Sequence, residues 1–85
     1  MLRDTKYAQE LKEPGVIHWG NEEGRIERLR IKEIDQVEIR FSWWKDGKLV
    51  PRPLDLSEQD LLMLMRDAIA KDVFSAEFLL DLRRL

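Results

Sequence analysis

Residues 36–50 read QVEIRFSWWKDGKLV and contain the clearest strand pattern in the chain. Apolar residues stand at positions 37, 39, 41 and 43, with polar residues between them, and this period of two predicts a β-strand with one buried face and one hydrated face. Asp46-Gly47 predicts a type I′ hairpin turn, because both central residues of that turn need a positive φ. We expect the returning strand to be a short edge strand, since the prolines at 51 and 53 cannot donate ladder hydrogen bonds.

The segment before this hairpin predicts two further strands. Residues 16–19 and 25–31 have the composition of strands, and residues 20–24 form the turn between them. Ile26 is out of phase with the apolar residues that follow it, and we attribute this to a β-bulge. The whole region from residue 16 to residue 54 is therefore predicted to be the sheet.

The N-terminal region, residues 1–14, is predicted to be an arm or a short helix over residues 4–12. Asp4 is suited to cap such a helix, and three apolar residues then fall on one helical face. Pro14-Gly15 would end the helix. The two alternatives, arm and helix, both remain open at this level.

Two helices are predicted after the sheet, within residues 57–85. Ser57 is a typical N-cap, and the helix that follows runs to about residue 72. Ser75 is likewise a typical N-cap, and it precedes a second helix predicted at about residues 76–84. The chain is thus predicted to be one α+β domain, residues 1–85, with an antiparallel sheet of three to four strands followed by two C-terminal helices packing on one face.

The composition argues against catalysis. The 85 residues include no cysteine and one histidine, His18, so thiolate nucleophiles and the usual clusters of transition-metal ligands are missing. No serine lies in a nucleophile motif, and the glycines do not form a phosphate loop. We therefore predict a protein that is not an enzyme and that holds no cofactor or metal.

The charged N-terminus and the short apolar runs further predict a cytoplasmic protein without a membrane segment.

The first candidate site is the sheet face turned away from the helices. Residues 25–52 carry eight basic and five acidic side chains, and we expect Trp44 to face the solvent among several cations. Bases stack on an exposed aromatic ring while cations attract phosphates, so this arrangement favours single-stranded DNA or RNA as the partner. The alternatives are an ordinary hydrated strand face and a Trp44 side chain that packs under the N-terminal segment. The predicted binding residues are Arg28, Arg30, Arg40, Trp44, Lys45, Lys48 and Arg52.

The second candidate site is the apolar run LLMLM at residues 61–65. Five consecutive apolar residues cover more than half of a helix surface, which is more than one sheet can bury. The alternatives are a seam or groove at the surface, or coverage by the second helix and the N-terminal segment. The predicted seam of a homodimer, or groove for another protein, consists of Leu61, Leu62, Met63, Leu64 and Met65.

Residues 37–65 resemble the C-terminal domain of the eukaryotic transcriptional coactivator called positive cofactor four, and its bacterial single-strand-binding relatives. The resemblance covers about a third of the chain and rests on Ser42-Trp43-Trp44, Asp46-Gly47, Pro51-Arg52-Pro53 and Leu54-Asp55-Leu56-Ser57. It implies a curved antiparallel sheet followed by a helix, dimerisation through that helix, and a single-stranded nucleic acid as ligand. The sequence departs from the family in having few basic residues just before the helix and in having a second helix.

Overall fold

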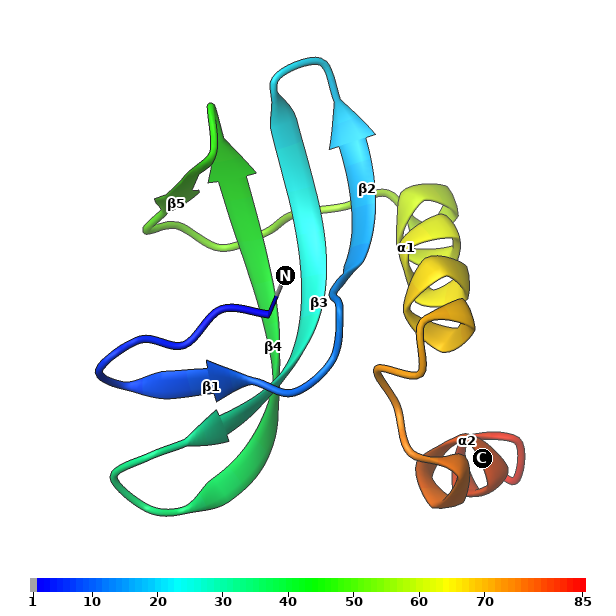
Figure 1. Ribbon diagram of the computed structural model, residues 1–85. Coiled ribbons are helices and arrows are strands. Elements are labelled where there is room, and N and C mark those ends of the chain that lie inside the picture. The colour runs from blue at the N-terminus through cyan, green and yellow to red at the C-terminus, as the bar shows by residue number, and fades with distance from the viewer. Residues whose placement is uncertain (1) are drawn as a thin grey trace.

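The computed structural model describes residues 2–85, which form five strands and two helices (Figure 1). The helices are α1 (Glu58–Ala70) and α2 (Ala76–Leu82). The α+β class is thus confirmed, with more strands in the sheet than the predicted three to four. The strands are β1 (Ala8–Glu10), β2 (Gly15–Trp19), β3 (Glu22–Ile31), β4 (Gln36–Lys45) and β5 (Lys48–Val50).

The strand β3 is the centre of an antiparallel sheet. Along one edge it pairs with β2 and then with β1, and along the other edge it pairs with the whole of β4. The short strand β5 pairs with the last three residues of β4. Because β3 has neighbours on both sides, its residues are the best placed to be buried on both faces of the sheet.

The predicted hairpin between β4 and β5 is confirmed. Asp46 and Gly47 have φ values of 51° and 75°, as a type I′ turn requires. The register pairs Lys45 with Lys48 and Trp44 with Leu49. The β5 strand lies at the end of the sheet order, as the prolines that follow it predict.

The predicted helix over residues 4–12 is wrong. Residues 8–10 form β1, which pairs with residues 29–31 of β3, and the flanking backbone continues the contact through the amide of Leu11 and the carbonyl of Arg28, 3.0 Å apart. A helix this short is marginal in water, whereas the open edge of β3 offers the same backbone groups a ladder of partners. Met1, the first residue of the predicted arm, lies outside the described residues.

Both predicted helix caps are confirmed. The hydroxyl of Ser57 accepts a hydrogen bond from the amide of Asp60 at 3.1 Å, and that of Ser75 accepts one from the amide of Phe78 at 3.1 Å. Each cap fixes where its helix begins, and each helix ends about two residues earlier than the sequence pattern predicts.

The core lies between α1 and the part of the sheet formed by β2 and β3. Gly15 makes this approach possible, because a Cβ built on Gly15 would lie 2.6 Å from the Cβ of Ala68 in α1. Any larger residue at position 15 would push the helix away from β2. The residues buried in this core are Ile17, Ile26, Leu64, Ala68, Val73 and Phe74.

The position of α1 overturns two predictions about the sheet. The β3–β4 register is continuous, so Ile26 does not follow a bulge; it faces α1, while Leu29 is buried on the opposite face. In β4, the residues predicted to be buried are largely exposed: Val37 by 44%, Ile39 by 38% and Phe41 by 49%. The physical reason is that α1 packs over β2 and β3, which leaves the apolar side of β4 beyond its reach.

Candidate functional site

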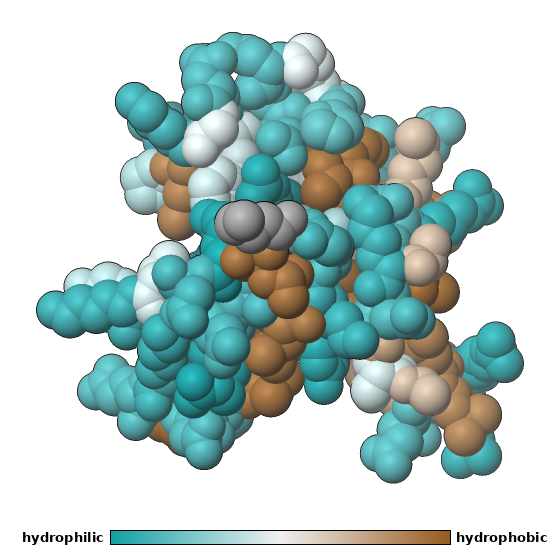
Figure 2. Space-filling model, in the orientation of Figure 1, coloured by the Kyte–Doolittle hydropathy of each residue, from teal (hydrophilic) through white to brown (hydrophobic). Residues whose placement is uncertain are grey.

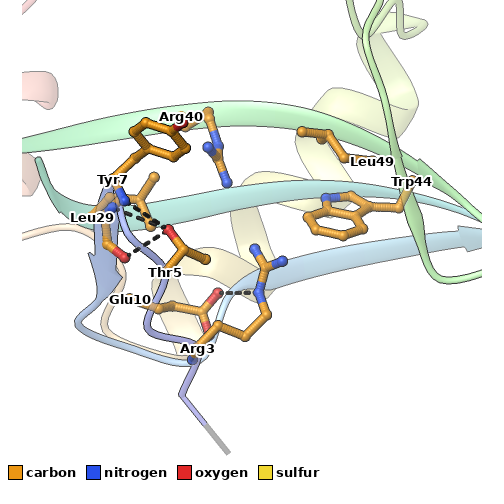
Figure 3. A pocket seen from close by; sticks show the side chains of 9 residues that line it. Arg3, Thr5, Tyr7, Glu10, Leu29, Arg40, Trp44 and Leu49 are labelled. Carbon is orange, nitrogen blue, oxygen red and sulfur yellow. Dashed lines mark hydrogen bonds and ion pairs between the residues drawn. The ribbon is translucent and has the colours of Figure 1, made fainter.

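The N-terminal segment crosses the sheet face opposite α1 and covers part of it, so this face is here called the arm face (Figures 1 and 3). Arg3 is the residue that ties the segment down. Its guanidinium donates from Nη2 to Glu27 at 2.9 Å, and its backbone amide donates to Glu10 at 3.2 Å. The chain itself therefore occupies part of the face that was predicted to be open.

Glu27 is the centre of a polar cluster on the arm face. Its side chain is fully buried, yet both carboxylate oxygens have partners. Oε1 accepts from the Ser42 hydroxyl at 2.6 Å and from Nε of Arg40 at 3.1 Å. Oε2 accepts from Nη2 of Arg3 at 2.9 Å and from Nη2 of Arg40 at 3.3 Å. The cluster thus joins the N-terminal arm to both long strands.

These contacts decide the charge state of Glu27. Burial on its own would raise the pKa of the carboxyl group. The hydrogen bonds from Ser42 and Arg40, together with the charges of Arg40 and Arg3, outweigh that effect and hold the pKa of Glu27 below its ordinary value. The side chain is therefore an anion at neutral pH, matched to the two arginines.

Trp44 is 7% exposed and belongs to the same buried layer. The guanidinium groups of Arg3 and Arg25 lie 4.3 Å and 4.1 Å from the centre of its ring system, within cation–π distance. The indole N–H donates to the hydroxyl of Ser42 at 2.9 Å. The ring thus already has cationic partners, which contradicts the expectation that it is an exposed stacking platform.

A cavity of about 390 Å³ opens on the arm face between the N-terminal segment and the β4–β5 hairpin (Figure 3). It brings Arg40, Trp44 and Leu49 together, as the strand parity and the hairpin register predict. Glu10 in its wall has one carboxylate oxygen, Oε2, that accepts no hydrogen bond from residues 2–85, and Nε of Arg3 lies 3.7 Å away from it. The lining residues are Arg3, Thr5, Tyr7, Ala8, Glu10, Leu29, Arg40, Trp44 and Leu49.

The predicted nucleic-acid residues do not form one surface. Arg28 and Arg30 pair with Ile39 and Val37 of β4 and so lie on the face opposite Arg40. Protein acceptors already hold both: Arg28 donates to the carbonyl of Val73, and Arg30 donates to the side chains of Gln9 and Asp35. Three predicted residues are exposed at or just beyond the β4–β5 hairpin, namely Lys45, Lys48 and Arg52.

The predicted apolar seam in α1 is divided by the packing of the helix. Leu64 is fully buried, and Met65 is half-buried against the core. Leu61, Leu62 and Met63 are exposed by 40%, 54% and 50%. The prediction that one sheet cannot cover all five residues is therefore confirmed, although Leu64 belongs to the core.

Apolar side chains also reach the surface near the C-terminus. Figure 2 shows them at the lower right of the molecule, where Figure 1 places α2. Phe78 and Leu80 of α2 are exposed by 45% and 50%. The second helix therefore does not bury the exposed residues of α1 and adds apolar surface of its own.

Sequence reasoning missed Arg3, Glu10 and Glu27. Glu27 carried a signal, because a carboxylate in phase with Leu29 in a central strand is a buried charge that needs partners. Arg3 carried none, since its role depends on the N-terminal arm returning to the sheet over a long stretch of chain.

Comparisons with protein-family models, with curated proteins and with solved structures gave no significant match. Among residues 2–85 there is no group of three or more side chains able to hold a metal ion. Within the same residues, neither helix has the length and apolar character needed to cross a membrane.

Proposed function

We propose that this protein is a non-catalytic interaction module that binds a basic, amphipathic segment of another polypeptide along the exposed apolar side of α1. The observation that carries the proposal is the exposure of Leu61, Leu62 and Ile69, by 40%, 54% and 42%. Large apolar residues gathered on one side of a helix favour a binding surface over a purely hydrated one.

These residues form one continuous surface, here called the helix patch: Leu61, Leu62, Met65 and Ile69. Residues three or four apart are neighbours on a helix, and the four members are linked by such spacings. The patch adjoins the buried stripe of Leu64 and Ala68, so its backbone is held rigidly by the core. Met63 lies on the other side of that stripe and is not part of the patch.

The charge around the helix patch indicates the chemistry of the partner. Residues 53–85 carry seven acidic and four basic side chains. On α1 itself, Glu58 stands three and four residues before Leu61 and Leu62, and Arg66 stands at the same spacings from Leu62 and Ile69, so both flank the patch. An apolar surface within an acidic region favours a partner with apolar residues at helical spacing and basic residues beside them. Met65, half-buried at the centre, suits a surface that adapts to its ligand.

Single-stranded nucleic acid is the second candidate, supported by the cavity on the arm face, where Tyr7 is 75% exposed near Arg40 and Trp44. It ranks second because Glu27 holds Arg40 and because Arg3 and Arg25 lie against Trp44. A base could stack on Trp44 only after Arg3 moves away. Tyr7→Ala in a low-salt anisotropy titration with labelled DNA tests this candidate, which requires salt-sensitive binding that the variant weakens.

The test of the first candidate is a selection from a displayed library of random 15-residue peptides, followed by calorimetry of the enriched peptides. Leu62→Glu places a charge in the helix patch, and Leu49→Glu is the matched control on the arm face, since Leu49 is similarly exposed. We expect enriched peptides with apolar residues at i, i+3 or i+4 and i+7 and with basic flanks. Leu62→Glu should weaken their binding at least tenfold, and Leu49→Glu should leave it unchanged.

Two outcomes would contradict the proposal. One is a selection that enriches no such pattern. The other is an affinity that Leu62→Glu and Leu49→Glu change equally, because the peptides would then not bind along α1.

A further inference from the structure

The strand β4 has a long unpaired edge. Its far end pairs with β5 through residues 43–45, and among the described residues no strand pairs with residues 36–42 on the side away from β3 (Figure 1). Seven residues of extended chain measure roughly 24 Å. An open apolar edge of this length is a template for pairing with another strand, and Val37, Ile39 and Phe41 lie along it, each exposed.

The other edges of the sheet are closed or short. The outward amide of Val16 in β2 donates to Oδ2 of Asp67 at 2.7 Å, and the ammonium of Lys71 donates to the carbonyl of Pro14 at 3.2 Å. The helix α1 thus caps the β2 edge with side chains. The strands β1 and β5 have three residues each. Residues 36–42 are therefore the long open edge within the described part of the chain.

The backbone of this edge has a defined orientation. In the two-residue hairpin, Lys45 and Lys48 are the hydrogen-bonded pair next to the turn, so odd-numbered residues of β4 direct their N–H and C=O groups away from β3. Asp46 stands at an even position, so its amide should point toward β3, and it does donate to the carbonyl of Asn21 beside β3. Val37, Ile39 and Phe41 therefore present six backbone groups at the open edge.

The sequence of the edge is complementary to itself. When two copies of residues 36–42 pair antiparallel about Ile39, each Ile39 meets the other Ile39 as a hydrogen-bonded pair, and Val37 meets Phe41. On the arm face the same register sets Glu38 opposite Arg40, twice by symmetry. Arg40 donates hydrogen bonds to Glu27 from Nε and Nη2. Its third nitrogen, Nη1, donates to none of the described residues. Nη1 can therefore donate to Glu38 of the other copy.

We propose that this edge pairs with the same edge of a second copy of the chain, centred on Ile39, to form a two-fold dimer with one continuous sheet. The occupant is a second copy because the charges complement each other in this register and the apolar residues fall on one face. In a two-fold dimer the whole of this edge is paired in both copies. The edges that stay unpaired are short or capped, so assembly stops at the dimer. This contact does not involve the helix patch.

Sedimentation velocity of the full chain over a concentration series tests the pairing. The wild-type protein should sediment as a dimer, with twice the chain mass of 10.2 kDa. Glu38→Arg converts two opposite-charge pairs into two like-charge pairs and should weaken dimerisation on the order of tenfold or more. Glu33→Arg makes the same change of charge at an exposed loop residue and should leave the dimer intact.

Ile39→Pro is the second variant. It removes an N–H that points away from β3, so the β3–β4 ladder is kept while the central pair of hydrogen bonds is lost. Circular dichroism should report a folded chain, and sedimentation should report a monomer. A third readout is amide exchange, which should be slow for Val37, Ile39 and Phe41 in the wild-type protein and fast for Val37 and Phe41 in Ile39→Pro, where residue 39 has no amide proton.

The proposal is overturned by a wild-type protein that stays monomeric at millimolar concentration. It is equally overturned by a dimer that both Glu38→Arg and Ile39→Pro leave unchanged, or by a dimer that Leu62→Glu dissociates while those two variants do not. The last result would place the second copy on the helix patch. Peptide binding at that patch, with a monomeric wild-type protein, would support the proposed function and refute the edge pairing alone.

Discussion

Glu27→Gln is the substitution that examines the polar cluster most directly. It keeps the shape of the side chain and removes its charge. A carboxamide has one accepting oxygen, which can retain the bonds from Ser42 and from Nε of Arg40. Its NH₂ group then faces the Nη2 donors of Arg3 and Arg40, so two charge-assisted bonds become donor–donor contacts at a buried site.

The size of the expected loss of stability depends on how exposed the two arginine partners of Glu27 are. Hydrogen bonds to a charged group contribute about 1.5–3 kcal/mol each, but the side chains of Arg3 and Arg40 are 39% and 41% exposed and regain water when the contact is lost. We therefore expect Glu27→Gln to lower the free energy of unfolding by about 2–3 kcal/mol. For a domain of this size that corresponds to a fall in Tm of about 10–20 °C.

Urea unfolding followed by tryptophan fluorescence measures this change, because Trp44 lies in the same cluster. Glu33→Gln, at an exposed position, is the control and should alter the free energy of unfolding by less than about 0.5 kcal/mol. A loss of similar size in both variants would refute the conclusion that the Glu27 cluster holds the arm on the sheet.

The pH dependence of the same experiment is a separate check. The pKa of Glu27 in the folded protein lies below its ordinary value of 4.5, so the stabilisation is complete above pH 4.5 and declines as the pH falls through the folded value. The difference between wild-type and Glu27→Gln should therefore be largest near neutral pH and shrink in acid. A difference that grows below pH 4.5 would mean that the pKa is raised.

Three further substitutions examine the packing of the helix and its contact with the sheet edge. Gly15→Ala should lower the free energy of unfolding by about 1–3 kcal/mol, because the new Cβ would lie 2.6 Å from the Cβ of Ala68; an unchanged calorimetric Tm would contradict this packing. Ser57→Ala should cost about 1 kcal/mol in a urea titration, since the first turn of α1 loses its acceptor, and a neutral result would mean that the cap is not used. Asp67→Asn should cost about 1 kcal/mol at neutral pH, because the amide of Val16 loses a charged acceptor. The pKa of Asp67 is lowered, as hydrogen bonds and charge outweigh the raising effect of burial, so this loss should fade in acid; a loss independent of pH would contradict the assignment.

The parts of the fold that local chemistry determines were predictable from the sequence. Asp46-Gly47 specifies its turn because few residue pairs accept two positive φ values, and that turn also fixes the register of Trp44 with Leu49. Ser57 and Ser75 begin their helices because a hydroxyl must satisfy amides that have no partner within the helix. These signals span two to four residues and hold wherever the segment lies in the fold.

The parts that depend on distant contacts were not predictable. Alternation in β4 indicated which residues share a face, but α1 covers that face only over β2 and β3, so Phe41 is exposed and not buried. Burial of Trp44 depends on Arg3, which lies 41 residues away in the sequence. Strand periodicity gives the parity of a side chain and does not reveal which segment lies over it.

The most direct measurement of the central claim is a map of amide and side-chain chemical shifts as a peptide selected on the wild-type protein is added. The peptide should shift the signals of Leu61, Leu62 and Ile69 in α1 and leave the indole N–H of Trp44 unmoved, because its partner Ser42 lies in the polar cluster beneath the arm. Shifts confined to Trp44 and the cavity on the arm face, with α1 unchanged, would contradict the assignment of binding to the helix patch.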